Sequence, residues 1–337
     1  MNIWQSIQSA IINGVSFSPA NRDHVNAGSE LTDAADAVNV NLEKLIQLRF
    51  HSSHIALNSQ RKAFSSLSGN YSSTFKGRGL NFDEVRPYQP GDDIRNIDWN
   101  VTARTDKVHT KVFKEERECP VYLIVDFSSS MYFGTRHCLK SVTAAKAAAL
   151  FAWAGADHAN RIGGFMFNDS RHVELRPRGG HHGVIRFLKL LTEFHNSKPG
   201  DTQKLTQQSL DSKQLFSRLR RVIHPGSIIL FASDFNQTST EVFNHLQYIA
   251  SHNDLVIAHI YDALEKELPP PGRYGVSDGH SLLTLDTQNS LLRKEFQQHF
   301  IDKCKTIEDF CLLNRINLIK LATDDNVENR FLTTLGK

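Results

Sequence analysis

The stretch VYLIVDFSSSM, residues 121–131, decides the fold. Its first five residues are apolar without a break, and Asp126 ends the apolar run. Runs of this kind are typical of parallel strands that are buried on both faces of a sheet. The serines that follow mark the place where the chain leaves the core.

Similar apolar runs recur along the rest of the chain. They cover residues 161–169, 227–234, 254–262 and 316–324. Between them, apolar residues recur at helical spacing over 139–158, 182–194, 209–222, 239–251 and 288–314, and a short helix is expected at the end of the chain. Strands that alternate with helices predict an α/β fold, a doubly wound and mostly parallel sheet with helices on both faces. The loop after 262 is expected to contain a short strand pair.

The chain before residue 119 has a different texture. Residues 1–38 form a weakly patterned extension, and residues 39–118 predict a smaller N-terminal module with a helix near 38–57. Short strand-like pieces surround the polar centre RPYQPGDDIRNIDWN of this module. The α/β domain is expected to cover 119–337.

Composition narrows the classes of partner and compartment. The chain is 40% hydrophobic and 22% charged, with a net charge of +3, so its overall charge does not indicate nucleic acid. Basic residues alternate with acidic ones where a basic stripe would be needed, at Arg86, Arg95, Arg104, Lys107 and Lys111. No apolar stretch is long enough to span a membrane, and the N-terminus does not resemble a signal peptide. Four cysteines without a C-x-x-C pair fit a reducing compartment, so we expect a cytoplasmic protein.

Oxygen-bearing side chains gather where the first of these strands ends. Asp126, Ser128 and Ser130 stand at alternate positions, and Asp234 ends a second apolar strand. Ligands collect beyond the carboxyl ends of parallel strands, and oxygen ligands suit a hard cation such as Mg²⁺. A serine-rich turn without a metal is the alternative interpretation.

A longer segment carries a family resemblance. The run GLNFDEVRPYQPGDDIRNIDWNVTARTDKVHTKVFKEERE, followed by YLIVDFSSSMYFG, resembles the bacterial domain-of-unknown-function family number 58. Members of that family carry a von Willebrand factor A-like domain and are often encoded beside MoxR-type AAA+ ATPases. The resemblance extends over about residues 40–325.

The resemblance implies a metal-ion-dependent adhesion site. Asp126, Ser128 and Ser130 match its first motif and Asp234 matches its last. The middle motif is a threonine on a loop, for which Thr202 is the better candidate and Thr206 the weaker. The implied partner is a MoxR-type AAA+ ATPase or the substrate of that ATPase.

The GDDIRNIDW segment allows two interpretations. Its charged residues and one aromatic residue lie close together in the sequence, namely Asp92, Asp93, Arg95, Asp98, Trp99 and Arg104. They could form an ion-pair knot that fixes a loop against the metal domain, with Trp99 as its apolar anchor. They could also form a docking surface.

No catalytic residues are predicted. Residues 275–279 match G-x-S-x-G, but the apolar strand that a nucleophile elbow requires does not precede the serine. A phosphate-binding P-loop motif is also missing from the sequence. We therefore expect a non-enzymatic, metal-dependent protein-binding module. The alternative is a hydrolase that uses the same ion to activate water.

Overall fold

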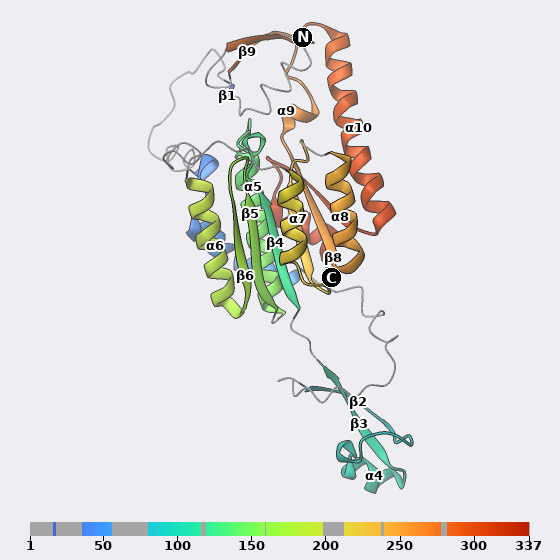
Figure 1. The fold of residues 1–337 in the computed structure, drawn as a ribbon. Helices are drawn as coiled ribbons and strands as arrows, with labels where there is room; N and C mark the ends of the chain where they lie inside the picture. The colour runs from blue at the N-terminus through green and yellow to red at the C-terminus, as the bar shows by residue number, and fades with distance from the viewer. Residues whose placement is uncertain are drawn as a thin grey trace. The chain divides into compact units, whose positions relative to one another are not determined.

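The structure is a computed structural model that describes residues 16–17, 36–55, 80–115, 119–158, 160–197, 212–236, 239–277 and 282–336 (Figure 1). The chain divides into two compact units. Residues Met1–Arg61 and Cys119–Lys337 form the larger unit, and Lys62–Glu118 form the smaller one.

A six-stranded sheet forms the centre of the larger unit. Its strands, in sequence order, are β4 (Pro120–Asp126), β5 (Arg161–Phe167), β6 (His172–Gly179), β7 (Ile228–Ser233), β8 (Asp254–Tyr261) and β11 (Asn317–Ala322). In space they follow the order β11-β8-β7-β4-β5-β6. Every neighbouring pair is parallel except β5 and β6. The predicted mostly parallel α/β sheet is therefore confirmed.

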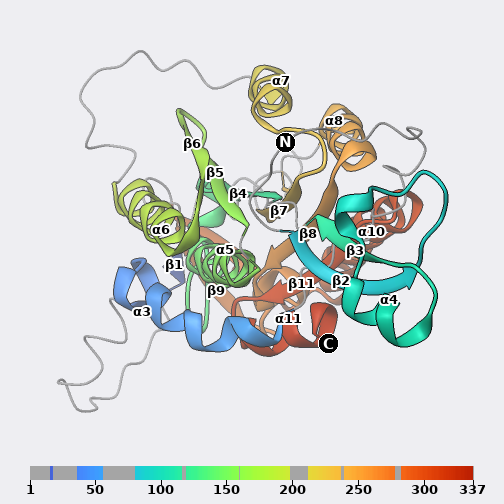
Figure 2. The ribbon, with the colours of Figure 1, turned by 90° about the horizontal axis from the view of Figure 1, so that it is seen from below.

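Helices cover both faces of this sheet (Figure 2). On one face lie α3 (Leu42–Gln47), α5 (Lys140–Asp157), α6 (Gly180–Asn196) and α11 (Val327–Leu335), and on the other lie α7 (Ser212–Val222), α8 (Thr240–His252) and α10 (Ser290–Asn314). The side chains of β4 alternate between the two cores. Leu123 and Val125 pack under α5, whereas Tyr122 and Ile124 pack towards α7 and α8.

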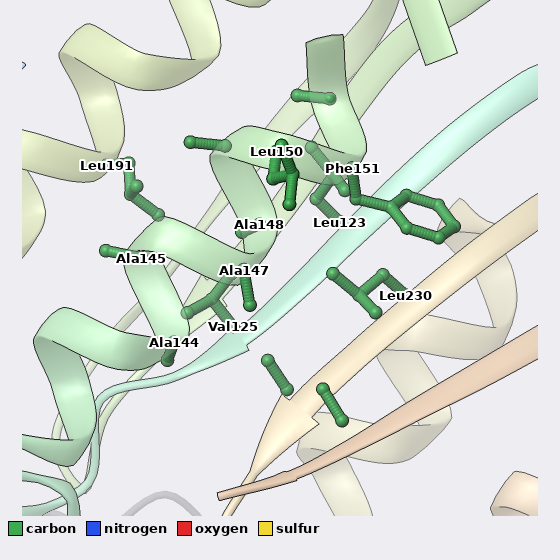
Figure 3. Close-up of a cluster of buried hydrophobic side chains, with 14 of the residues drawn as sticks. Leu123, Val125, Ala144, Ala145, Ala147, Ala148, Leu150, Phe151, Leu191 and Leu230 are labelled. Carbon is green, nitrogen blue, oxygen red and sulfur yellow. The ribbon is translucent and has the colours of Figure 1, made fainter. Parts of the chain in front are cut away.

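The alanines of α5 let this helix lie close to the sheet (Figure 3). Ala144, Ala147 and Ala148 are fully buried, and they lie with Leu123 and Leu230 in one core cluster. Small side chains permit a short distance between helix and strand backbones, so sixteen of the eighteen residues of α5 are buried.

Gly164 on β5 likewise allows the neighbouring helix α6 to pack closely on the sheet. A Cβ atom at Gly164 would lie 2.7 Å from two ring carbons of Phe187 on α6. The missing side chain therefore makes room for a buried aromatic ring.

Short elements complete the larger unit. They are the 3-10 helices η1 (Leu48–His54) and η4 (Ser129–Met131), the short helix α9 (Ala263–Lys266), and the strands β1 (Ser16–Phe17), β9 (Arg273–Ser277) and β10 (Leu282–Asp286). β9 pairs with both β1 and β10, and the β9–β10 pair was expected from the sequence. Of the helices that the structure describes, none combines the length and the apolar character needed to cross a lipid bilayer.

The smaller unit is built on an antiparallel hairpin. It consists of β2 (Leu80–Pro87) and β3 (His109–Glu115), with the 3-10 helix η3 (Ile94–Asn96) and the helix α4 (Trp99–Thr105) between them. Thr110 is the one buried residue among residues 85–111, whose burial is described.

Two features differ from the sequence expectations. β6 was not expected, because its sequence HVELRPRG is polar and contains Pro177, as suits an antiparallel edge strand. The helix expected near 38–57 is the short α3 followed by η1. It packs in the larger unit, where the Nε1 atom of Trp153 on α5 donates a 3.0 Å hydrogen bond to the carbonyl of Leu45. The expected domain boundary at residue 39 would instead group this segment with the hairpin.

Candidate metal site at the carboxyl edge of the sheet

The order of the strands brings two carboxylates to one edge of the sheet. From β4 the chain moves outward through β5 and β6, returns to β7 beside β4, and moves outward again to β8 and β11. The carboxyl ends of β4 and β7 therefore meet where the strand order reverses, the place where open α/β sheets bind ligands. Asp126 ends β4, and Asp234 follows the last residue of β7.

Asp126 is buried and fixed by hydrogen bonds from two neutral donors. Its Oδ1 accepts from the backbone N–H of Ser128 at 2.8 Å, and its Oδ2 accepts from the hydroxyl of Ser233 at 2.6 Å. Burial, followed by the nearby charge of Asp234, raises the pKa of the Asp126 carboxyl well above its usual range. An ionised Asp126 is therefore costly unless a cation lies beside it.

The two predicted serine ligands come together after β4. The Oγ atoms of Ser128 and Ser130 are 3.3 Å apart, and both residues are buried. The turn η4 begins between them, and the backbone N–H of Ser129 donates to Asp169 Oδ2 at 2.7 Å. Asp169 lies in the loop between β5 and β6, and the sequence analysis did not include it in the site. It fixes the backbone that presents the two hydroxyls.

Asp234 has the strongest set of partners at this edge. Its Oδ2 lies 2.7 Å from the Nζ of Lys140 and accepts from Asn236 Nδ2 at 3.0 Å, while its Oδ1 accepts from the backbone N–H of Asn236 at 3.0 Å. Burial alone would raise the pKa of Asp234, but the charges of Lys140 and Lys303 outweigh burial and hold this pKa below its usual range. Asp234 is therefore an ionised carboxylate.

Lys140 is a fully buried cation that the sequence analysis missed. It is the first residue of α5, none of its side chain is exposed, and its Nζ lies 2.6 Å from Glu265 Oε1 as well as 2.7 Å from Asp234. Burial alone would lower the pKa of Lys140, but the two carboxylates raise it above its usual range, so the ammonium form persists. Lysine at the start of a helix is usually exposed, so the sequence offered no signal for this pairing.

The oxygen atoms gathered at this edge are of the kind that bind a hard cation. Asp126 has a free lone-pair position on each oxygen, and two hydroxyls lie in the same turn. Within the described residues no group of three or more His, Cys, Asp or Glu side chains is placed to hold a metal ion, so such a site would depend on the serine hydroxyls. Carboxylate and hydroxyl oxygens are ligands that Mg²⁺ accepts, with water completing its shell.

The remaining predicted ligand falls outside this description. Thr202 and Thr206 both lie between 198 and 211, which are not among the described residues.

The GDDIRNIDW segment forms its own local contacts in the smaller unit. Asp92 pairs with Arg86 at 2.7 Å, and Asp98 caps α4 while lying 3.6 Å from Lys111. Asp93 accepts from the backbone N–H of Arg95 and so caps η3. The acidic residues of the segment thus act mainly as helix caps.

The aromatic residue of that segment is exposed within its own unit. Trp99 is 67% exposed, and Arg95 and Arg104 are exposed as well. The ion-pair knot with Trp99 as its anchor against the metal domain stays a prediction, as does the docking surface.

Comparisons with known proteins place the sequence in a family. Residues 84–306 match the family described as "Protein of unknown function DUF58". Relatives include the uncharacterized protein Mb1516 of Mycobacterium bovis and the uncharacterized protein Rv1480 of Mycobacterium tuberculosis. Each is 28% identical over 246 residues, which cover 72% of this chain and 75% of the relative.

Two solved structures resemble the fold distantly. The conserved hypothetical protein BatB of Bacteroides thetaiotaomicron matches with a TM-score of 0.39 and 11% identity, over 64% of this chain and 95% of that chain. An aerotolerance-related membrane protein of Bacteroides fragilis matches with a TM-score of 0.37 and 12% identity, over 64% of this chain and 96% of that chain.

Proposed function

Given that this chain belongs to the DUF58 family, we propose that it is a non-enzymatic, divalent-metal-dependent protein-binding module. The observation that carries the proposal is the meeting of Asp126, Ser128 and Ser130 with the end of β7, through the Ser233–Asp126 hydrogen bond of 2.6 Å. In the proposed site, Mg²⁺ or a similar divalent cation is held by Asp126, Ser128 and Ser130. Asp234 acts on it through water, and Thr202 is the expected loop ligand.

The charges at this edge favour an acidic partner. Asp126 is the one proposed direct ligand that carries a negative charge, because the two serines are neutral. The charge of Asp234 is paired with that of Lys140. A dication held in this way keeps excess positive charge. A carboxylate from a partner protein at an open coordination position would neutralise it, which links partner binding to the metal.

Binding is favoured over catalysis by the hydrogen bonding of the site. Each oxygen of Asp126 already accepts a hydrogen bond, and Asp234 is held by Lys140 and Asn236. A general base needs an acceptor that can take a proton from water and release it. Asp126, fixed by Ser128 and Ser233, suits ligation better than proton transfer, and Asp234, held by Lys140 and Asn236, suits a role through water.

The family resemblance extends the proposal to fold type and partner. The strand order, with a single antiparallel edge strand, supports a von Willebrand factor A-like assignment for the larger unit. The proposed partner is a MoxR-type AAA+ ATPase or that ATPase's substrate. None of the four cysteines, all of which lie in the described part of the chain, is in a disulfide bond, which supports the cytoplasmic setting that we propose.

The test is a binding measurement with and without metal. Purified chain would be titrated calorimetrically with Mg²⁺, and then with the AAA+ ATPase encoded nearest to it, in Mg²⁺ or in EDTA. Asp126→Ala is expected to lose both binding events. Asp309→Ala, which removes an exposed carboxylate from α10, is expected to retain both. Equal ATPase affinity for the wild type and Asp126→Ala, in both buffers, would rule out the metal-dependent mode.

A further inference from the structure

The buried lysine at the start of α5 adds a positive charge beside the proposed metal site, which a site made of two carboxylates does not need. A lysine side chain with no exposed surface loses its hydration. It stays charged only where nearby carboxylates offset the free-energy cost of that loss. Asp234 and Glu265 do so, at 2.7 Å and 2.6 Å from Nζ. Asp234 directly follows β7, and Glu265 lies in α9. Two distant parts of the chain therefore converge on one ammonium group.

Together with the hydrogen bonds from Asn236, this contact occupies most of the lone-pair positions with which Asp234 could bind a metal ion. A carboxylate has about four lone-pair positions. Three hydrogen bonds already reach Asp234, two on Oδ2 from Lys140 and Asn236 and one on Oδ1 from the backbone of Asn236. By contrast, Asp126 receives one hydrogen bond on each oxygen, and both donors are neutral. The two carboxylates are therefore unequal as ligands, and the additional, charged hydrogen bond on Asp234 comes from Lys140.

We propose that the ammonium group of Lys140 is an internal counter-ion that holds Asp234 back from direct metal coordination and so keeps the intrinsic affinity for a divalent cation low. The inference rests on the proposed function, since it concerns the same metal site. Its consequence is that the site binds metal tightly only together with an anionic group from a partner. Lys140 is thus a residue that sets the dependence of metal binding on the partner.

Glu265 makes it possible to test Lys140 without leaving buried charges unpaired. The ammonium group lies 2.7 Å from Asp234 and 2.6 Å from Glu265, so removing Lys140 alone would leave both carboxylates without this cation. Glu265 also accepts, through Oε2, a 3.0 Å hydrogen bond from the backbone N–H of Asp262 in the capping box of α9. Glutamine retains an acceptor for that bond. The variant Lys140→Met/Glu265→Gln therefore removes one positive and one negative charge while keeping the volume and the cap.

The experiment measures metal binding directly. The wild type, the double variant and a control would be titrated with MgCl₂ and with MnCl₂ by calorimetry, with no partner present. Circular dichroism and thermal unfolding in EDTA would establish that each is folded. The control, Lys266→Met/Glu267→Gln, makes the same charge change with two exposed side chains beside the same cap. Freeing Asp234 from its contact with the ammonium group is expected to tighten binding by roughly tenfold or more in the double variant, and to leave the control unchanged.

The outcomes separate this inference from the proposed function. Tighter metal binding by the double variant than by a wild type that also binds supports both. Unchanged or weaker binding by the double variant overturns the role of Lys140 and leaves the metal site standing. Binding by the double variant alone supports the counter-ion, and the ATPase titration in Mg²⁺ and in EDTA then decides whether the natural protein depends on metal. If neither protein binds metal, both ideas fail.

Discussion

The hydroxyl of Ser233 donates a 2.6 Å hydrogen bond to the carboxylate of Asp126, and so joins the end of β7 to the end of β4. The same Oγ atom accepts from the backbone N–H of Phe235 at 3.1 Å, in the turn where Phe235 has a φ of 55°. One buried side chain thus orients a predicted metal ligand and the turn that follows Asp234.

Replacing Ser233 by alanine is expected to destabilise the protein by about 1–3 kcal/mol, because it leaves a buried carboxylate oxygen and a buried N–H without this partner. Urea unfolding of both proteins measures the change. Ser251→Ala is the control, since the Ser251 hydroxyl bonds near an exposed helix end. A loss no larger than that of the control would show that the strand ends do not depend on Ser233.

Replacing Asp126 by asparagine is expected to stabilise the metal-free protein at neutral pH. The folded-state pKa of Asp126 is raised by burial and by Asp234. The stability that this carboxyl contributes is therefore present below its unfolded-state pKa, near 4, and is lost as the pH rises through the folded-state pKa. Asparagine avoids that loss, so a gain of roughly 1–3 kcal/mol at pH 7.5 should shrink towards zero near pH 4.

The measurement is urea unfolding in EDTA across this pH range, repeated in Mg²⁺. Added Mg²⁺ should stabilise the wild type and leave Asp126→Asn unchanged, which reduces or reverses the difference at pH 7.5. A metal-free variant that is less stable than the wild type at pH 7.5 would contradict the raised pKa.

Replacing Gly164 by alanine tests the packing of α6 on β5. The new Cβ would lie 2.7 Å from the ring of Phe187, so the helix or the ring must move, at a cost of about 1–3 kcal/mol. Gly179→Ala is the matched control in the neighbouring strand, because its Cβ would meet nothing closer than 4.0 Å. Thermal unfolding of the two variants should separate them clearly, and equal melting temperatures would show that Phe187 adjusts without cost.

The parts of the fold that followed from the sequence are those buried on two faces. VYLIVD and SIILFASD are apolar because helices cover both sides of the sheet, so their unbroken apolar runs indicate β4 and β7. β6 lies at the edge and pairs on one side, and its alternating polar residues resemble a loop. The pattern of apolar residues in a sequence reflects which side chains are buried. An edge strand has few buried side chains, so its pattern is weak.

The candidate site divides in a similar way. The serines after Asp126 are adjacent in sequence, so their convergence could be predicted from local geometry. The contacts of Lys140 with Asp234 and Glu265 join residues that are 94 and 125 positions apart. Such pairs depend on the order of the strands and on where α5 and α9 begin, and no local pattern encodes them.

The alternation of the serines after β4 leads to the sharpest prediction about metal binding. The Oγ atoms of Ser128 and Ser130 lie together, 3.3 Å apart, whereas Ser129 contributes its backbone N–H to Asp169. Ser128→Ala and Ser130→Ala should each weaken Mg²⁺ binding by roughly tenfold, as expected for losing one neutral ligand, with little effect on overall stability. Ser129→Ala keeps the backbone contact and should bind as the wild type does.

The three variants would be compared by calorimetric titration with MgCl₂, with unfolding curves in EDTA to show that each is equally stable. Because the three serines are consecutive and chemically identical, differences in composition or net charge cannot explain a pattern in which the outer two matter and the middle one does not. Equal weakening in all three would mean that the hydroxyls act only through the backbone of the turn. The cation would then have to be held by the carboxylates without them.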